Sequence, residues 1–212
     1  MTDRPTAIAS SRTRSTFLGE ICGIGTSSGY RLVVGRWEQS PLGSFTDVMM
    51  EGPDGVRTLL APNQTVADYV RSTYTFDAVE VVEVVAVRRP TGLTLTAGRL
   101  HLDAVIGKRS PIGYVVRAVP RRIAVAPWWA TAIDPFARIA MRGVRTRGTA
   151  GNGRREWYGA TDAKRITSVS AALGGTDLGT LTDVWPPVRF GFGSTPRAPS
   201  AVSVASTVEE IT

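Results

Sequence analysis

The segment from residue 143 to residue 162, GVRTRGTAGNGRREWYGATD, concentrates residue types that could bind an anion or move a proton. It holds four arginines and five glycines. In a strand, alternation would put Arg155 on the opposite side from Glu156 and Tyr158. Inside a barrel, Glu156 and Tyr158 could act as an acid and base pair, with a pKa that burial raises or arginine lowers. A structural ion pair is the alternative.

A second candidate is VRFGFGSTPR, residues 188–197, where alternation groups Phe190 with apolar neighbours and Arg189 with two glycines. Glycines beside an arginine leave open space above a strand, where a ligand carboxylate or phosphate could approach the guanidinium bidentately. Equally, the strand could cross another backbone, with Arg189 paired to an internal acid. The candidate ligand-binding residues are therefore Arg155, Tyr158, Arg189 and Phe190.

The chain is basic, with a formal net charge of +7 over 212 residues. Such a charge raises nucleic acid or an anionic membrane surface as partners, acting through the Arg-rich segment 117–155. However, only Lys108 and Lys164 among the 25 basic residues are lysine. Codon bias in a GC-rich genome explains that excess of arginine as well as phosphate recognition does.

One cysteine, Cys22, and one histidine, His101, limit the chemistry. They exclude a disulfide framework within the chain and an ordinary two-histidine or multi-cysteine metal site. We therefore expect no metal and no cofactor, and a reducing, cytoplasmic location. No apolar run is long enough for a transmembrane helix. The sequence is compatible with a homo-oligomer.

Most of the chain has the pattern of strands. The residues 16–25 and 30–37 predict an opening hairpin, and Pro53-Asp54-Gly55 predicts a second hairpin turn within 43–62. Asn63 predicts the N-cap of a short helix over 64–72. Further strands are expected at 74–87, 93–106, 114–119, 155–160, 165–173, 188–192 and 201–208, and a helix from Pro127 to about Met141.

About ten strands with two or so short helices favour a mainly β (α+β) fold with a curved antiparallel sheet, closed into a barrel, because closure removes exposed edges. We expect a disordered tail at residues 1–15. The rest, 16–212, is expected to form a single β-rich domain with a helical insertion near 120–142.

Three phrases of the sequence resemble known proteins. The stretches SPLGSFTDVMMEGPDGVRTLLAP, GVRTRGTAGNGRREWYGATD and PPVRFGFGSTPRAPS look like those of an uncharacterised actinobacterial family. The first is also similar to the "SP-G-Y-E" strand of the acetoacetate decarboxylase superfamily. This resemblance implies a curved antiparallel barrel with a ligand cavity inside it.

Acetoacetate decarboxylases use a lysine that becomes nucleophilic beside another cation and forms a Schiff base with a carbonyl substrate. This chain departs from that pattern, because no lysine pair follows the helix expected at 64–72. Lys108 falls in an expected turn, whereas Lys164 opens a strand, which is the better environment. If the chain is an enzyme, such as a lyase of decarboxylase type without the lysine pair, the candidate reactive groups are Glu156 and Lys164.

The leading hypothesis from the sequence is a cytoplasmic barrel that binds a small anionic or carboxylated, partly apolar molecule, with or without turning it over. Arg155 and Arg189 would supply charge, and Tyr158 and Phe190 would supply walls. The competing hypothesis is peripheral binding to an anionic membrane or to nucleic acid through the segment 117–155.

Overall fold

The computed structural model describes residues 12–124, 126, 128–129, 147–149, 155–191 and 195–211. Within these ranges the strands are β1 (Arg12–Thr26), β2 (Arg31–Gln39), β3 (Phe45–Glu51), β4 (Arg57–Ala61), β5 (Ala78–Val81), β6 (Val84–Arg89), β7 (Gly92–Ala97), β8 (Leu100–Arg109), β9 (Arg147–Thr149), β10 (Arg155–Leu173), β11 (Thr176–Asp177), β12 (Leu181–Thr182) and β13 (Ser200–Ile211). The helices are α1 (Gln64–Thr73), α2 (Pro111–Ala118) and α3 (Arg121–Ala124). The prediction of a mainly β fold is confirmed.

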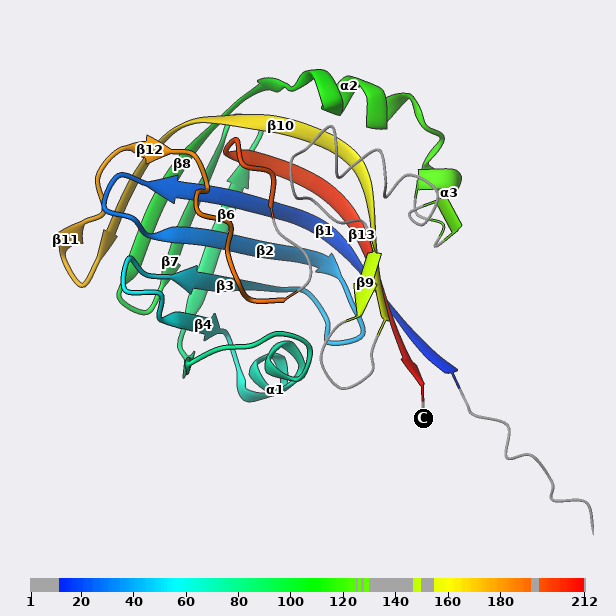
Figure 1. The fold of residues 1–212 in the computed structure, drawn as a ribbon, viewed down its shortest axis with the longest axis horizontal. Helices are drawn as coiled ribbons and strands as arrows, with labels where there is room; N and C mark the ends of the chain where they lie inside the picture. The colour runs from blue at the N-terminus through cyan, green and yellow to red at the C-terminus, as the bar shows by residue number, and fades with distance from the viewer. Residues whose placement is uncertain are drawn as a thin grey trace, which may run out of the picture.

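The strands join into one strongly curled sheet, in the order β5-β4-β3-β2-β1-β13-β10-β8-β7-β6. Neighbours in this order are antiparallel, except that β4 and β5 are parallel. The long strands β1, β13 and β10 bend together across the molecule (Figure 1). The predicted curvature is confirmed, and the sheet is a half-barrel with β5 and β6 as its edges.

The predictions from turn chemistry and capping are confirmed. β1 and β2 form the opening hairpin, and β3 and β4 form the second one. Gly55 has φ 83°, a left-handed conformation that glycine adopts without strain, in the turn between β3 and β4. The Asn63 side chain caps α1 by accepting a hydrogen bond of 3.0 Å from the backbone N–H of Val66.

The single strand expected over 74–87 is wrong, because the chain forms β5 and β6 there, at opposite edges of the sheet. α1 returns the chain to β4, and β5 then pairs parallel to β4. Val82 and Glu83 separate the two strands. A run rich in valine indicates extended backbone, but it does not indicate where the backbone changes partner.

The run 93–106 also divides, into the antiparallel strands β7 and β8, which turn at Gly98 and Arg99. Gly98 has φ 56°, which suits a tight turn. The predicted alternation in β8 is confirmed, since Leu102 and Ala104 are buried whereas His101 and Asp103 are exposed.

The strand expected over 114–119 is wrong, because this segment lies in α2 and the turn after it. The Ser110 hydroxyl accepts a hydrogen bond of 3.1 Å from the backbone N–H of Gly113, and Pro111 occupies the first turn. Serine followed by proline is a helix start signal. The β-branched valines of the segment favour extended backbone, but the helix start signal prevails here.

Other expected boundaries differ as well. The segments 155–160 and 165–173 belong to the one strand β10, and the described residues 188–191 are outside any strand. β1 begins at Arg12, so residues 12–15 of the expected tail are strand, while residues 1–11 lie outside the described residues. Of the helix expected over 127–141, only residues 128 and 129 are described.

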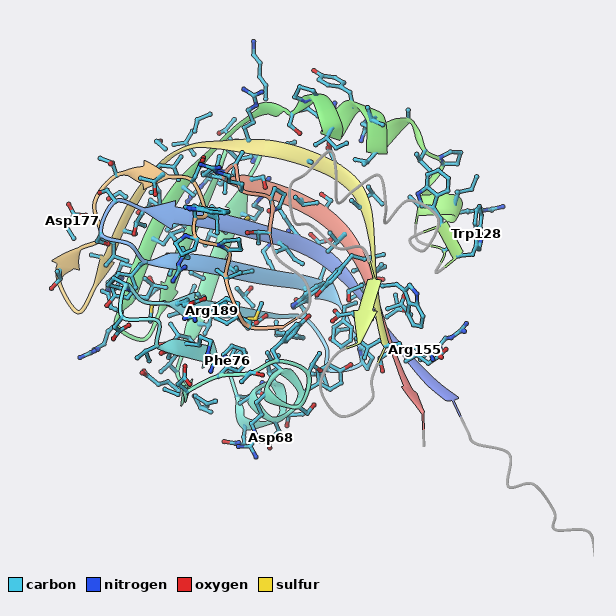
Figure 2. The ribbon with its side chains drawn as sticks, in the orientation of Figure 1. Asp68, Phe76, Trp128, Arg155, Asp177 and Arg189 are labelled. Carbon is cyan, nitrogen blue, oxygen red and sulfur yellow. The ribbon has the colours of Figure 1, made fainter. Side chains whose placement is uncertain are left out.

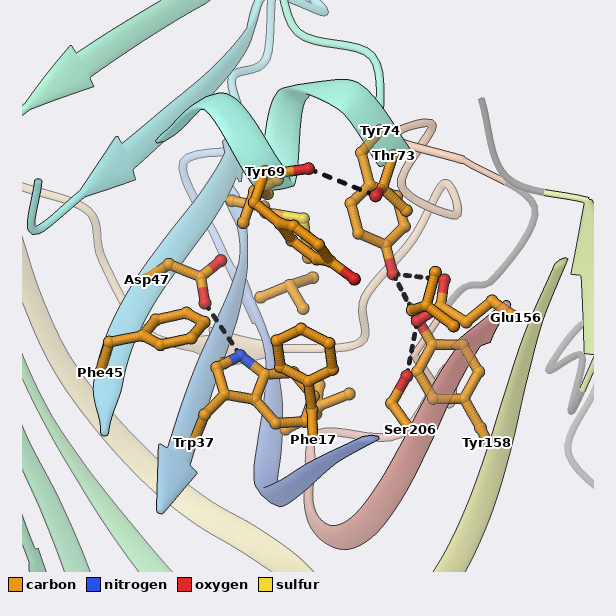
Figure 3. A pocket seen from close by; sticks show the side chains of 16 residues that line it. Phe17, Trp37, Phe45, Asp47, Tyr69, Thr73, Tyr74, Glu156, Tyr158 and Ser206 are labelled. Carbon is orange, nitrogen blue, oxygen red and sulfur yellow. Dashed lines mark hydrogen bonds between the residues drawn. The ribbon is translucent and has the colours of Figure 1, made fainter. Parts of the chain in front are cut away.

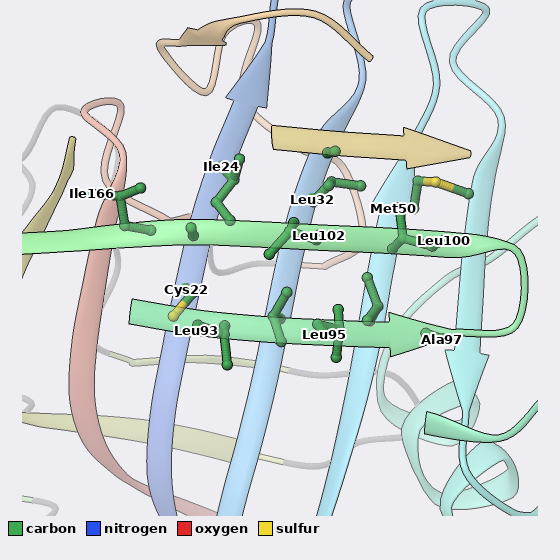
Figure 4. Close-up of a cluster of buried hydrophobic side chains, with 14 of the residues drawn as sticks. Cys22, Ile24, Leu32, Met50, Leu93, Leu95, Ala97, Leu100, Leu102 and Ile166 are labelled. Carbon is green, nitrogen blue, oxygen red and sulfur yellow. The ribbon is translucent and has the colours of Figure 1, made fainter. Parts of the chain in front are cut away.

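The main core fills the space between β1–β4 and the crossing strands β7 and β8 (Figure 4). Ile24, Leu32, Leu95 and Leu102 are almost completely buried in it. The opposite face of β1–β4 packs against α1 and against residues 184–190. These strands are therefore buried on both faces. Among the described residues, no helix is long and apolar enough to cross a membrane.

We expect Leu95→Ala to lower the free energy of unfolding by about 2–5 kcal/mol, because it leaves a void in the main core. Val87→Ala, on the exposed face of β6, is the control and should change it by less than about 0.5 kcal/mol. Urea unfolding of the two variants measures both values. Similar losses in both variants would contradict the assignment of the core.

Candidate functional site

A cavity of about 50 Å³ lies under α1, on the face of β1–β3 that is opposite the main core. We call it the α1 cavity. Since roughly 10–15 Å³ suffices for one water molecule, it can hold a few waters or a small organic group. Its walls are mainly aromatic and aliphatic side chains. Glu156, Tyr158 and Ser206 form a polar end at β10 and β13, while Asp47 of β3 lies on the other side (Figure 3). The lining residues are Phe17, Ile21, Val33, Gly35, Trp37, Phe45, Asp47, Met49, Tyr69, Val70, Thr73, Tyr74, Glu156, Tyr158, Ser206 and Val208.

The aromatic wall is centred on Phe17 of β1. Its ring centroid lies 5.6 Å from that of Trp37 and 5.2 Å from that of Tyr69 on α1. Phe45 packs edge-on against Phe17, with the centroids 6.5 Å apart. Aromatic pairs at such distances stabilise a fixed geometry beyond the area that they bury. One wall of the cavity is therefore rigid and apolar.

Glu156 of β10 forms the polar end of the cavity. It is 3% exposed. The Tyr74 hydroxyl lies 2.8 and 3.0 Å from its two carboxyl oxygens, and the Ser206 hydroxyl donates to Oε1 at 2.7 Å (Figure 3). The hydroxyls of Tyr74 and Tyr158 are hydrogen-bonded to each other. Three hydroxyl groups, from three segments of the chain, therefore surround one buried carboxyl group.

Strand register brings these groups together. In the pairing of β10 with β13, Glu156 lies opposite Val208, and Tyr158 lies opposite Ser206. Alternate residues of a strand share a face. Glu156, Tyr158 and Ser206 consequently point to the same side, and Tyr74 reaches them from the end of α1.

Burial raises the pKa of Glu156 above its usual range, while the hydrogen bonds from Ser206, Tyr74 and Tyr158 partly oppose that rise. No described lysine or arginine forms an ion pair with Glu156. Burial, followed by the nearby Glu156 charge, holds the pKa of Tyr74 and Tyr158 well above that of free tyrosine. The two phenols therefore stay protonated as donors, and Glu156 is the group that gains or loses a proton.

Asp47 of β3 is a second buried carboxyl group in the same cavity. Trp37 donates its indole N–H to Oδ1 at 3.1 Å, and burial raises the pKa of Asp47 to about 7. Asp47 lies opposite Gly35 of β2. A Cβ atom at Gly35 would lie 2.7 Å from Asp47 Oδ1, so glycine leaves the room that this side chain occupies.

The sequence candidates in β10 lie in different environments. Glu156 and Tyr158 line the α1 cavity together, whereas Arg155 is exposed. Lys164 is half-buried farther along β10, opposite Arg109 of β8, and does not belong to the described lining.

Arg189 and Phe190 lie outside the cavity, and Arg189 is far from Arg155 (Figure 2). Arg189 donates from Nε and Nη2 to Glu51 at 2.9 and 2.8 Å, and its backbone N–H donates to the other carboxyl oxygen at 2.9 Å. Glu51 is completely buried and also pairs with Arg31 at 3.2 Å. Phe190 is buried against Phe76. Arg189 therefore forms an internal ion pair, which was the alternative to ligand binding that the sequence left open.

Sequence reasoning missed Asp47, Tyr74, Ser206 and the aromatic wall. Asp47 carried a weak signal, because it is an acid within an apolar strand. Tyr74 and Ser206 carried none, since both enter the site through contacts between segments far apart in the chain. Among the described residues, no group of three or more His, Cys, Asp or Glu side chains is placed to hold a metal ion.

Neither the protein-family models nor the curated proteins include a match to this chain. Among solved structures, it is similar to the acetoacetate decarboxylase of Legionella pneumophila, with 10% identity, a TM-score of 0.44, and coverage of 100% of this chain and 92% of that one. A second acetoacetate decarboxylase structure has 12% identity, a TM-score of 0.43, and coverage of 97% and 92%.

Asp47→Asn should stabilise the protein increasingly as pH rises. The pKa of Asp47 is higher in the folded chain than its ordinary 3.8, so the folded state binds the proton more tightly. The wild-type free energy of unfolding should therefore fall between about pH 4 and pH 7, by as much as about 4 kcal/mol. Asparagine keeps the acceptor for Trp37 and has no charge to bury.

Urea unfolding at pH 4, 6 and 8 measures this difference between variant and wild type. The control is Asp68→Asn on the exposed side of α1, which makes the same substitution outside the cavity and should not reproduce the stabilisation at pH 8. An Asp47→Asn variant less stable than wild type at pH 8 would show that the Asp47 charge is neutralised in the fold.

Proposed function

We propose that the α1 cavity binds a small, partly apolar molecule, and that Glu156 exchanges a proton with a polar group of that molecule. One observation carries this proposal: a buried carboxyl group, held by three hydroxyls and paired with no described cation, faces an aromatic cavity. Burying such a group costs free energy, so it is commoner at functional sites than in cores that serve packing alone.

The charges of the cavity favour a neutral or positively charged ligand. The anionic ligand expected from the sequence depended on Arg155 and Arg189, and neither side chain belongs to the described lining. Glu156 and Asp47 both belong to it. A ligand carboxylate would be repelled by them when they are ionised, whereas an ammonium or hydroxyl group could donate a hydrogen bond to either one.

The polar groups also suggest what the cavity could do to a ligand. When Glu156 is ionised, Tyr74 can donate to it and Tyr158 can donate to the Tyr74 oxygen. When Glu156 is protonated, it can give its proton to a basic atom of a ligand, with the hydroxyls stabilising the carboxylate that remains. This arrangement supports proton transfer and leaves the class of reaction open.

The alternative of an anionic membrane or nucleic acid as partner has weaker support. Its segment, 117–155, contributes exposed residues such as Arg117, Arg122 and Arg155 among those described. Exposed arginines are ordinary on a basic chain and need no functional explanation. The enclosed pair of carboxyl groups does need one.

Three probes with the same four-carbon skeleton test the proposal: isobutylamine, isobutanol and isobutyrate, titrated by calorimetry at pH 6 and pH 8. The amine should bind, and more tightly at pH 8 by roughly tenfold, because Asp47 with a pKa of about 7 ionises in that interval. The alcohol should bind with little dependence on pH. Glu156→Gln should weaken amine binding roughly tenfold or more, while the exposed control Glu38→Gln should leave it unchanged.

Absence of binding by all three probes would contradict the proposal. Isobutyrate binding that is lost in Arg155→Gln or Arg189→Gln would instead restore the anionic ligand expected from the sequence.

A separate test concerns Lys164 as a reactive group. We expect borohydride reduction with isobutyraldehyde to give no more adduct at Lys164 than at the exposed Lys108, because Lys164 does not belong to the described lining of the cavity. Peptide mass mapping measures the two sites. Selective labelling of Lys164 would establish an imine-forming lysine and overturn this expectation.

A further inference from the structure

A second and larger cavity, of about 180 Å³, opens at one end of the main core. We call it the rim cavity. It lies where the turn between β3 and β4, the edge strand β5, the turn between β7 and β8, and the end of β10 meet. Its polar lining comes from Tyr30, Asp54, Thr58, Glu80 and Arg99. None of these residues lines the α1 cavity.

Thr58 is the buried polar group of the rim cavity. It is 7% exposed and lies opposite Met50 of β3. Thr58 and Leu60 face the main core, whereas Leu59 faces α1 on the other side of the sheet. The Thr58 hydroxyl oxygen is open to the cavity and is not one of the buried atoms that lack a partner. A ligand atom in the cavity can therefore hydrogen-bond to it.

Charges of both signs line the rim cavity without pairing to each other. Arg99 lies on one side, next to Gly174, whose backbone N–H donates to the Arg99 carbonyl at 2.9 Å. Asp54 lies in the turn between β3 and β4, and Glu80 lies in β5. Asp54 accepts one backbone N–H, from Val56 at 3.0 Å. No described residue forms an ion pair with any of the three.

We propose that the rim cavity binds a small zwitterion that carries one ammonium and one carboxylate, the chemistry of a free amino acid. The Arg99 guanidinium receives the carboxylate, as its planar donors allow. Glu80 and Asp54 receive the ammonium, and the Thr58 hydroxyl bonds to either group. A metal ion fits less well, because no described set of three metal-ligating side chains lies here.

Calorimetric titration of the full chain with glycine, L-alanine and L-serine tests this site. At least one of them should bind, and acetate and methylammonium, which each carry only one of the two charges, should bind at least tenfold more weakly. Arg99→Gln and Glu80→Gln should each weaken binding roughly tenfold or more. Thr58→Val, which keeps the shape and removes the hydroxyl, should weaken it by a smaller factor.

Arg89→Gln and Glu83→Gln are matched controls, because they make the same charge changes on exposed residues outside the rim cavity. They should leave binding unchanged. Glu156→Gln should also leave it unchanged, so this site can fail or stand independently of the α1 cavity. The proposal is overturned if none of the three amino acids binds, or if the control variants weaken binding as much as the test variants do. It is also overturned if Ca²⁺ binds at these residues and no zwitterion does.

Discussion

The register of β1, β13 and β10 is the constraint on which both the core and the α1 cavity depend. Phe17 lies opposite Ser206, and Ser206 lies opposite Tyr158, so one face of three strands carries the site. Cys22 and Ala201, opposite each other, point into the main core. Because side chains alternate with a period of two, a slip of one residue would exchange these faces. It would put Glu156 into an apolar core with no partner for its charge.

Local signals predicted much of this architecture. Turn residues and an N-cap were enough for both hairpins and for α1, because each feature is decided within a few residues of chain. Alternation also predicted that Glu156 and Tyr158 share a side of β10. It could not tell which layer of the fold covers that side. The burial that raises the pKa of Glu156 arises in the packed fold, where Tyr74 and Ser206 from distant segments lie against its carboxyl group.

The failures of prediction concern partners that are distant in sequence. Arg189 and Glu51 are separated by 138 positions, so no local pattern distinguishes an arginine that fixes a segment from one that binds a ligand. The Tyr74 hydroxyl meets Glu156 across 82 positions. The split between β5 and β6 has the same origin, because a run rich in valine indicates extended backbone throughout and hides a change of partner strand. In each case the pairing follows from the packed sheet.

Glu51 and Glu156 are both buried acids, but the groups that hold them differ. Both are almost inaccessible to solvent. Glu51 is held by two guanidinium groups, which fix residues 184–191 against β2 and β3. Glu156 is held by hydroxyls, which can donate to its charged form but do not neutralise it. A carboxyl group that must only hold a segment in place gains from a cation, whereas one that must exchange a proton is better placed among hydroxyls, where both protonation states remain accessible.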